Sequence, residues 1–254
     1  MLFFSATVPK WVTGLVQKYL TDPKWIDVSS TDPTKNSTNL DITHLCISCP
    51  PFARDDTLVD LVKVHAGHYG KTVIFCDTKK EVNELSVHPA LTEFGVGVLH
   101  GDIAQATRDL TLDSFKAGKI RALIATDVAA RGLDIPHVNL VIQTKVPLDK
   151  ESYVHRSGRT GRAGKKGVSL VFYSLREQPA LRVLEHALKL QFKRIGPPQP
   201  ADIIKGAATD AVKTIENVHQ DSIDFFKDQA KKLLEDKAGA EEEIVAACLA
   251  SLAG

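Results

Sequence analysis

From residue 40 to about residue 195, short apolar runs alternate with amphipathic helical patterns, and this alternation restricts the possible folds more than any other feature of the sequence. The runs are short and rich in Val, Ile and Leu, as strands buried on both faces of a sheet are. Strand and helix in turn at this spacing predict βαβ units, and therefore an α/β fold with a parallel sheet. We expect strands at Ile42–Ser48, Thr72–Cys76, Val96–Leu99, Ala122–Ala125, Leu140–Gln143 and Val168–Phe172, and helices at Asp55–Ala66, Lys79–Ser86, Gln105–Lys116 and Glu177–Lys189.

Residues 1–35 do not continue this alternation. They predict a strand remnant at Leu2–Phe4, a helix at Trp11–Leu20 and a short strand at Trp25–Val28, followed by the polar linker SSTDPTKNST. These elements look like the end of a preceding domain. We therefore expect residues 1–35 to be such a remnant plus a linker, and residues 36–195 to form the main domain.

Residues 196–254 predict a third unit, because the prolines of GPPQP at 196–200 stop one helix and start a new segment. Six lysines, eleven acidic residues and no arginine give residues 199–254 a net charge of −5, whereas the preceding 198 residues carry +6. This difference indicates two units with different tasks, and it argues against RNA binding by the tail. Three helical patterns follow the prolines, with apolar stripes at Ile204, Ala208, Ala211, Ile215 and Val218, at Ile223, Phe226, Ala230 and Leu233, and at Ile244, Cys248 and Leu252.

These three stripes need a surface to pack on. Three short helices make a thin core, so an apolar stripe is left for a partner. Two-fold pairing with a second copy is the commonest arrangement of this kind. The alternative is that the stripes fold back onto the main domain and leave a monomer. We expect a homodimer through residues 200–254, with an interface formed by Ile204, Ile215, Ile223, Phe226 and Leu233.

Composition excludes several other classes of protein. Hydrophobic residues make up 43% of the 254 residues and charged residues 25%, which is typical of a globular protein and not of a disordered or collagen-like one. The apolar runs are too short to span a bilayer, and the first residues predict no signal peptide. Four cysteines make a disulfide framework unexpected and favour a reducing compartment. Cys46 and Cys49 have no second ligand pair and lie on a predicted strand, so we expect no metal site.

The strongest functional signal is the segment YVHRSGRTGRAG at Tyr153–Gly164. Arg156, Arg159 and Arg162 recur at every third residue, a spacing that puts side chains on one side of a helix or tight turn. The intervening glycines let a bulky anion approach the backbone, and guanidinium groups match phosphate oxygens in geometry. The segment therefore predicts a phosphate-binding site rather than a solvated basic loop.

Two further segments follow predicted strands at their carboxyl ends, where parallel sheets bind ligands. In ATDVAARGLDIP, Thr126 and the following backbone N–H groups can hold a phosphate, and Asp134 suits a ribose hydroxyl or a bound water. In LHGDIAQATR, Gly101 closes a strand, and Arg108 near the start of the next helix can reach a backbone phosphate. Both segments therefore add candidate phosphate contacts to the first one.

Together with Ser5-Ala6-Thr7 and VIFCDTKKE at Val73–Glu81, these segments resemble the DEAD-box ATP-dependent RNA helicases, in particular their second, C-terminal RecA-like domain. The resemblance covers about residues 1–195. SAT is similar to motif III of that family, VIFCDTKKE to motif IV, Gln105 with Arg108 to the Q-x-x-R element, ATDVAARGLD to motif V and HRSGRTGR to motif VI. Ser157 stands where the family commonly has isoleucine. The tail, from FKRIGPPQPADIIK onward, is similar to the nucleolar RNA helicase II (Gu) subfamily, whose relatives carry a helical extension linked to dimerisation.

The resemblance implies a fold and a set of roles. It implies a RecA-like parallel sheet flanked by helices, preceded by the end of the first RecA-like domain and followed by a helical extension. Arg159 and Arg162 would be arginine fingers on the β- and γ-phosphates of ATP, with Gly132 and Asp134 facing the ribose or the lytic water. The residues that would contact RNA phosphates are Gly101, Arg108 and Thr126. The residues that would couple the two RecA-like domains are Ser5, Thr7, Arg131, His155 and Arg156.

The sequence also lacks parts of such an enzyme. It contains no G-x-x-x-x-G-K-[ST] loop, no Asp-Glu-Ala-Asp string and no adenine-reading glutamine motif. ATP and Mg2+ would therefore be bound mainly by the first RecA-like domain, and we expect the 254-residue chain alone to be inactive. As part of a full-length RNA helicase it would supply the arginine fingers and half of the RNA-binding surface.

Other interpretations stay open. One is a catalytically inactive dimer module that binds RNA or a partner, and another is a DNA helicase of the same superfamily. A phosphate-loop lysine encoded upstream of Met1 would favour the enzyme. The resemblance implies a nuclear, in particular nucleolar, location and a role in ribosome biogenesis or RNA remodelling, with a mitochondrion or chloroplast as the alternative location and no membrane partner.

Overall fold

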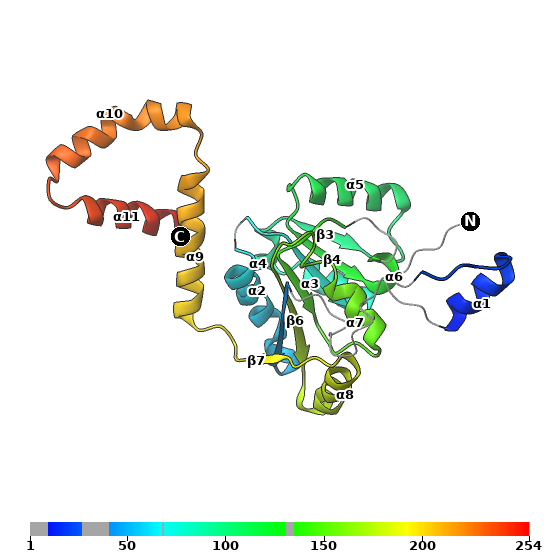
Figure 1. Cartoon of the computed structure of the whole chain (residues 1–254). Coiled ribbons are helices and arrows are strands. Elements are labelled where there is room, and N and C mark those ends of the chain that lie inside the picture. Colours follow the sequence, from blue (N-terminus) through cyan, green and yellow to red (C-terminus); the bar gives the residue numbers. More distant parts are fainter. Residues whose placement is uncertain (1–9, 27–40, 68, 131–134, 254) are drawn as a thin grey trace.

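The computed structural model describes residues 10–26, 41–67, 69–130 and 135–253, and its centre is a seven-stranded sheet (Figure 1). The strand order is β3-β4-β2-β5-β6-β1-β7, and neighbouring strands pair in parallel. This confirms the parallel α/β sheet, and no end of the six strands predicted for the main domain is wrong by more than one residue. The strands are β1 (Ile42–Ser48), β2 (Thr72–Cys76), β3 (Val96–Leu99), β4 (Ala122–Thr126), β5 (Leu140–Gln143), β6 (Gly167–Tyr173) and β7 (Lys193–Ile195).

Helices cover both faces of the sheet, which explains why its strands are apolar throughout. In β2, Ile74 and Cys76 pack with one group of helices, whereas Val73 and Phe75 pack with the other. The first group is α2 (Arg54–His65), α3 (Lys79–Ser86) and α4 (Pro89–Thr92). The second group is α5 (Gln105–Lys116), α6 (Asp127–Ala130), α7 (Lys150–Ser157) and α8 (Gln178–Leu188).

Several short elements were not predicted. Strand β7 has only three residues, and the exposed Lys193 and Arg194 are typical of a protected sheet edge. Helices α4 and α6 have four residues each, too few for a periodic pattern. Helix α7 begins where the Asp149 carboxylate accepts a hydrogen bond from the backbone N–H of Ser152 at 2.7 Å.

The amino-terminal helix is confirmed as α1 (Lys10–Tyr19). The short strand expected at Trp25–Val28 is wrong in its described part, because Trp25 and Ile26 are exposed and lie in no strand. A strand forms only beside a pairing partner, and none of the described strands runs next to these two residues. The strand expected at Leu2–Phe4 and the polar linker lie outside the described residues.

Three helices form the carboxyl-terminal extension, as predicted: α9 (Pro200–Glu216), α10 (Gln220–Asp236) and α11 (Glu241–Ala253). The extension projects from the side of the sheet that carries α2 (Figure 1). Helix α9 packs on α2 and on α11. The stripe predicted for α9 is partly wrong: Ala211 is buried, but Ile204 is 68% exposed. The packed face runs instead through residues that are buried or half-buried, namely Ile203, Gly206, Ala207, Asp210, Ala211 and Thr214.

Specific contacts seat α9 on the main domain. The Tyr69 hydroxyl donates a hydrogen bond to Thr214 Oγ1 at 2.9 Å. Gly67 has φ +64°, and a Cβ on it would lie 2.1 Å from Asp210 Oδ2, so only glycine lets this carboxylate approach the turn. Because the four residues between β7 and α9 include Pro197 and Pro198, the connection is short and stiff. We call the contacts of Gly67 and Tyr69 with α9 the α9 seat.

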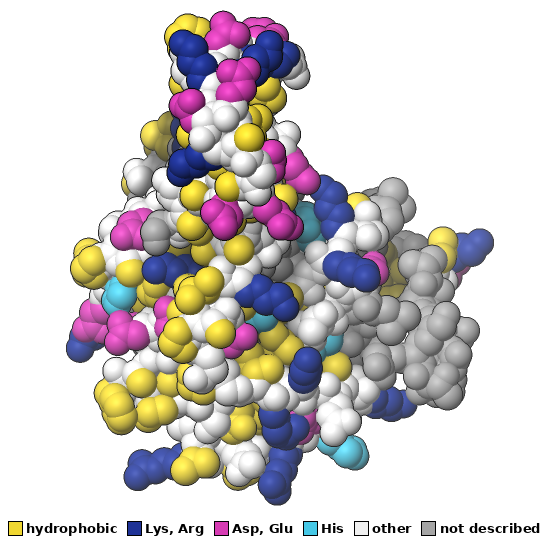
Figure 2. All heavy atoms as spheres, turned by 90° about the vertical axis from the view of Figure 1, so that its left-hand side faces the viewer, with side chains coloured by type: hydrophobic (Ala, Val, Ile, Leu, Met, Phe, Trp, Pro, Cys, Tyr) yellow, Lys and Arg dark blue, Asp and Glu magenta, His cyan; other side chains and the backbone are white. Residues whose placement is uncertain are grey.

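Helix α10 packs very differently from α9. Every residue from 217 to 239 is exposed, so α10 rests on none of the described elements. Its apolar stripe is nevertheless intact: Phe226 is 62% exposed, and Ile223 and Leu233 are exposed as well. Figure 2, which looks onto the side that carries the extension, shows apolar side chains exposed among acidic and basic ones. An uncovered stripe of this kind indicates a missing partner surface.

Candidate functional site

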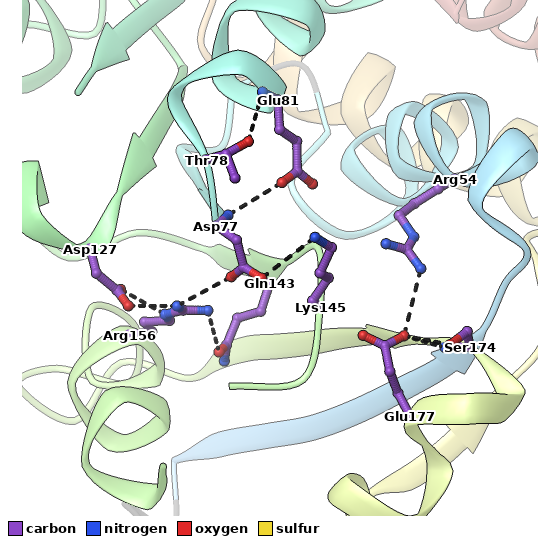
Figure 3. Close-up of polar contacts among 10 residues, drawn as sticks. All are labelled: Arg54, Asp77, Thr78, Glu81, Asp127, Gln143, Lys145, Arg156, Ser174 and Glu177. Carbon is purple, nitrogen blue, oxygen red and sulfur yellow. Dashed lines mark hydrogen bonds and ion pairs between the residues drawn. The ribbon is translucent and has the colours of Figure 1, made fainter. Parts of the chain in front are cut away.

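Helix α7 carries the buried arginine that organises the site. The Arg156 guanidinium donates from Nε to Asp127 Oδ1 at 2.7 Å and from Nη2 to Asp127 Oδ2 at 2.6 Å (Figure 3). It also lies over the ring of Phe75, with Cζ 5.5 Å from the ring centroid. Since Asp127 is the first residue of α6, this bidentate pair ties α6 to α7 and so joins two of the predicted motifs.

A second buried contact fixes the other side of α7. His44 Nδ1 in β1 and the Tyr153 hydroxyl in α7 are 2.5 Å apart, and the two rings pack against Phe192. Burial lowers the pKa of His44 to about 4, because the interior disfavours the imidazolium. Burial likewise raises the pKa of Tyr153. Both side chains are therefore neutral at ordinary pH, and their contact holds α7 against β1.

The Arg156 pair is the centre of a larger polar cluster at the carboxyl ends of β2, β4 and β5 (Figure 3). Arg156 Nη1 lies 3.5 Å from Gln143 Oε1, and Arg156 Nη2 lies 3.9 Å from Asp77 Oδ1. Lys145 Nζ lies 3.6 Å from the other oxygen of Asp77. We call Asp77, Asp127, Lys145 and Arg156 the edge cluster.

The segment after α7 is clamped to the segment before β5. The backbone N–H of Val138 donates to the Arg159 carbonyl at 3.1 Å, and Thr160 Oγ1 donates to the Val138 carbonyl at 2.5 Å. Thr160 is buried against Gly167, where a Cβ would lie 1.8 Å from Thr160 Oγ1. The position of Arg159 is therefore set by packing around Thr160 rather than by helix α7 alone.

Arg162 is held by backbone oxygens. Its Nε donates to the Gly158 carbonyl at 2.6 Å and its Nη1 to the Ile135 carbonyl at 2.8 Å. These partners fix the guanidinium without neutralising its charge, which is what binding a phosphate requires. Of the three arginines only Arg156 lies within α7, so the three side chains do not share one helix face. Arg159 lies beside a hollow that Asp127, His155 and Arg156 also line.

The predicted RNA contacts lie at the carboxyl ends of neighbouring strands. Thr126 ends β4, and Gly101 follows β3, the next strand in the sheet. Arg108 in α5 donates from Nη2 to the carbonyls of His100 and Gly101, at 3.3 and 3.2 Å. The structure thus brings Gly101 and Arg108 together, and a Cβ on Gly101 would meet nothing within 4 Å. The surface at Gly101 is therefore open for a ligand to approach.

Other expected site residues lie outside the described part of the chain. They are Ser5, Thr7, Arg131, Gly132 and Asp134. The roles implied for them stay predictions.

Sequence analysis missed Lys145 and three further polar residues of this cluster that lie at strand ends: Asp77, Asp127 and Gln143. Asp77, Asp127 and Gln143 each end or directly follow a buried strand, and that position is itself the signal. Gln143 carries a second signal, because it is fully buried at the end of an otherwise apolar run. A buried polar side chain needs a hydrogen-bonding partner, and Arg156 is that partner.

The cysteines and histidines form no metal site in the described ranges, where no group of three metal-binding side chains occurs. Cys46 and Cys49 are buried and free, and burial raises the pKa of the Cys46 thiol to about 11. Among the described helices, none is long and apolar enough to cross a membrane.

Two segments of the chain match known protein families. Residues 53–164 match the helicase conserved C-terminal domain, and residues 199–252 match the DDX21/DDX50 dimerisation domain. The solved C-terminal domain of the DEAD-box protein Dbp5 is 32% identical with a TM-score of 0.57, covering 64% of this chain and 94% of that one. A Leu-to-Val variant of Saccharomyces cerevisiae Dbp5 bound to RNA and ADP BeF3 is 31% identical with a TM-score of 0.66, covering 80% of this chain and 52% of that one. The chain therefore belongs to the DEAD-box RNA helicase family and contains its C-terminal RecA-like domain.

Within that family, the dimerisation domain points to a smaller group. Homo sapiens ATP-dependent RNA helicase DDX50 is 41% identical over 254 residues, which is 100% of this chain and 34% of DDX50. Rattus norvegicus Nucleolar RNA helicase 2 is 42% identical over the same length, 32% of that protein. This chain spans about a third of the length of these relatives, and it resembles the nucleolar RNA helicase II (Gu) subfamily throughout.

Proposed function

We propose that this chain is the second motor domain and the dimerisation module of an ATP-dependent RNA helicase. Its units would be the remnant of the first RecA-like domain at 1–35, the C-terminal RecA-like domain at 36–195 and the helical extension at 196–254. The observation that carries the proposal is the clamp around Thr160, which holds Arg159 and Arg162 next to residues 135–138. An arginine fixed by neutral carbonyls, as Arg162 is, suits charge that develops on a transferred phosphoryl group.

ATP and Mg2+ would be bound mainly by the first RecA-like domain. The fit to this chain rests on Arg162, whose guanidinium contacts only backbone oxygens in its described side-chain hydrogen bonds and keeps its charge for a phosphate. When bound, the nucleotide supplies the phosphoanhydride that is cleaved. Arg159 and Arg162 would act as the arginine fingers, and Gly132 and Asp134 would face the ribose or the lytic water.

RNA would lie across the carboxyl edge of β3 and β4. Its phosphates would be contacted by Gly101, Arg108 and Thr126. Such contacts recognise the shape of the RNA strand rather than its sequence. The open surface at Gly101 and the position of Arg108 beside it support this assignment. The solved Dbp5 complex contains RNA, which agrees with an RNA partner for this domain.

Coupling between the two RecA-like domains would involve Ser5, Thr7, Arg131, His155 and Arg156. His155 is exposed on α7, as a residue that meets another domain should be. Arg156 is buried with Asp127, so its effect would pass through α6 rather than through direct contact.

The arginine fingers can be tested in the full-length protein. Arg159→Ala or Arg162→Ala should lower kcat by about 10³–10⁵-fold, because a finger acts on transition-state charge, while RNA affinity changes little. Lys165→Ala is the matched control, since it removes a nearby exposed charge and should leave kcat unchanged. Equal losses of RNA binding and turnover would instead assign these arginines to RNA.

Dimerisation would use the exposed stripes of the extension. The match to a dimerisation domain and the uncovered helix α10 support a homodimer through residues 200–254. Its interface would contain residues that are all exposed in the single chain, namely Ile204, Ile215, Ile223, Phe226 and Leu233.

Location and process follow from the relatives. Relatives named Nucleolar RNA helicase 2 favour a location in the nucleolus over a mitochondrion or chloroplast. They also favour a role in ribosome biogenesis or RNA remodelling. An inactive dimer that binds RNA or a partner is the second candidate, and the match to a dimerisation domain would suit it as well. A full-length transcript with a phosphate-loop lysine upstream of Met1 would exclude it.

A further inference from the structure

Lys145 is a charged residue at the carboxyl edge that the proposed function does not use. It follows β5, and its side chain is 40% exposed. Its described ionic partner is Asp77, which follows β2 and is 42% exposed. Figure 3 shows Asp77 between Lys145 and Arg156. Because the Arg156 side chain is only 7% exposed, Lys145 lies at the more exposed end of the edge cluster.

The sheet places Lys145 close to the proposed RNA path. Strand β2 lies between β5 and β4, and Cys76 in β2 is level with Thr126 in β4. The backbone N–H of Thr144 still donates to the Phe75 carbonyl, at 3.0 Å, so the chain leaves the sheet only at Lys145. Adjacent strands are about 4.8 Å apart, which puts the Lys145 backbone roughly 10 Å from the end of β4. A lysine side chain can extend over much of that distance.

The partners within the edge cluster leave Lys145 available for a phosphate. Arg156 neutralises Asp127 through two short hydrogen bonds, and it lies farther from Asp77, at 3.9 Å. Glu81 is turned to the backbone N–H of Asp77, at 3.3 Å. The contact between Lys145 and Asp77 is thus a half-exposed ion pair at 3.6 Å, of a kind that contributes little to stability. A phosphate dianion or diester can replace Asp77 at this ammonium group at low cost.

We propose that Lys145 is a further phosphate-binding residue of the RNA surface, and that Asp77 holds it in place in the RNA-free protein. The inference rests on the proposed function, since it requires RNA at the carboxyl edge. Asp77 then competes with the RNA backbone for Lys145. Removing Asp77 strengthens RNA binding, whereas a purely structural ion pair would give a loss.

The test is the salt dependence of RNA binding by the full-length protein, measured by fluorescence anisotropy with a single-stranded RNA oligonucleotide. For Lys145→Met, the slope of log K against log salt should fall by about 0.7, the value for one phosphate on a single strand. Over the decade from 0.1 to 1 M salt, this slope corresponds to about fivefold weaker binding at 0.1 M. Lys119→Met, an exposed lysine before β4 at the opposite edge, is the control and should leave the slope unchanged.

For Asp77→Asn, the direction of the change in RNA affinity decides between a competing and a purely structural Asp77. It should tighten RNA binding by about 1.5- to 5-fold, the range that release of an exposed ion pair allows. This gain should vanish in the double variant with Lys145→Met. An unchanged slope for Lys145→Met, or weaker binding by Asp77→Asn, would overturn the inference. Thr126→Ala and Arg108→Ala in the same assay separate the two ideas: if they weaken binding and Lys145→Met does not, only the inference on Lys145 fails.

Discussion

Asp127→Asn is the substitution that tests most directly how the site is held together. The change keeps the shape of the side chain and one acceptor oxygen, but it removes the charge that faces the Arg156 guanidinium. Asp127 and Arg156 side chains are 27% and 7% exposed, so the arginine cannot turn to water instead. The variant therefore leaves a buried cation without its bidentate partner.

The magnitude follows from the burial of the pair. Breaking a fully buried ion pair costs about 3–5 kcal/mol. Asp127 is partly exposed, and Asp77 lies 3.9 Å from the same guanidinium, so we expect a loss of about 2–3 kcal/mol in the free energy of unfolding. For a domain of this size, each 1 kcal/mol lowers Tm by about 2–4 °C, which gives a decrease of roughly 5–10 °C.

Thermal unfolding of the 254-residue chain, followed by circular dichroism, measures this difference. Asp102→Asn is the matched control, because Asp102 and Lys79 form an ion pair at 2.7 Å, close to the 2.6 Å of the buried pair, but with both side chains about 60% exposed. We expect its Tm to stay at the wild-type value, since exposed pairs contribute little. Equal Tm changes in the two variants would refute the argument that burial makes the Arg156 pair important.

Four further predictions use the same chain. Burial lowers the pKa of His44 from 6.5 to about 4, so between pH 6.5 and pH 4 the folded state binds fewer protons than the unfolded state. The free energy of unfolding should therefore fall as pH decreases over this range. In denaturation experiments at several pH values, His44→Gln should make this decrease smaller. Gly167→Ala should displace Thr160, lower stability by about 2–4 kcal/mol in urea unfolding, and in the full-length protein reduce kcat more than RNA affinity. Ile223→Glu with Phe226→Glu should convert a dimer to a monomer in light scattering at micromolar concentration, whereas a wild-type monomer would contradict the proposed interface. The chain alone should show no ATPase activity with or without RNA, and ATP turnover at a rate typical of an intact helicase would contradict this prediction.

The sheet was predictable from the sequence because its strands are buried on both faces. Continuous apolar runs such as Thr72–Cys76 end where polar residues begin, so their bounds are sharp. Strand β7 was not predictable, since Lys193–Ile195 has no apolar run and is a strand only because β1 offers it a free edge. Helix α6 was missed for a similar reason: its four residues are held by the tertiary pair of Asp127 with Arg156 rather than by local periodicity.

The site was only partly predictable. The arginines were singled out because three in a glycine-rich segment are unusual. Their spacing did not indicate that Arg156 contacts α6 or that Arg162 contacts the carbonyl of residue 135. Pairing across more than twenty residues depends on how the chain returns to the sheet, which periodicity does not encode. In α9 the periodicity itself misled, because the packed face through Ile203 and Ala207 contains small and polar residues that carry little apolar signal.

The α9 seat has a mechanical consequence for an assembly of two chains. A flexible connection would let each motor rotate freely about the dimer, and its encounter with a shared RNA would then depend on linker length. Here the Tyr69–Thr214 hydrogen bond, the close approach of Asp210 to Gly67 and the two prolines before α9 make the connection a rigid bracket. In the proposed homodimer, the symmetry axis of the extension would therefore fix the direction in which each carboxyl edge faces. It would also fix the angle between two RNA segments bound at the same time. Loosening the bracket, for example by Tyr69→Phe with Thr214→Ala, would alter that angle while leaving each motor intact.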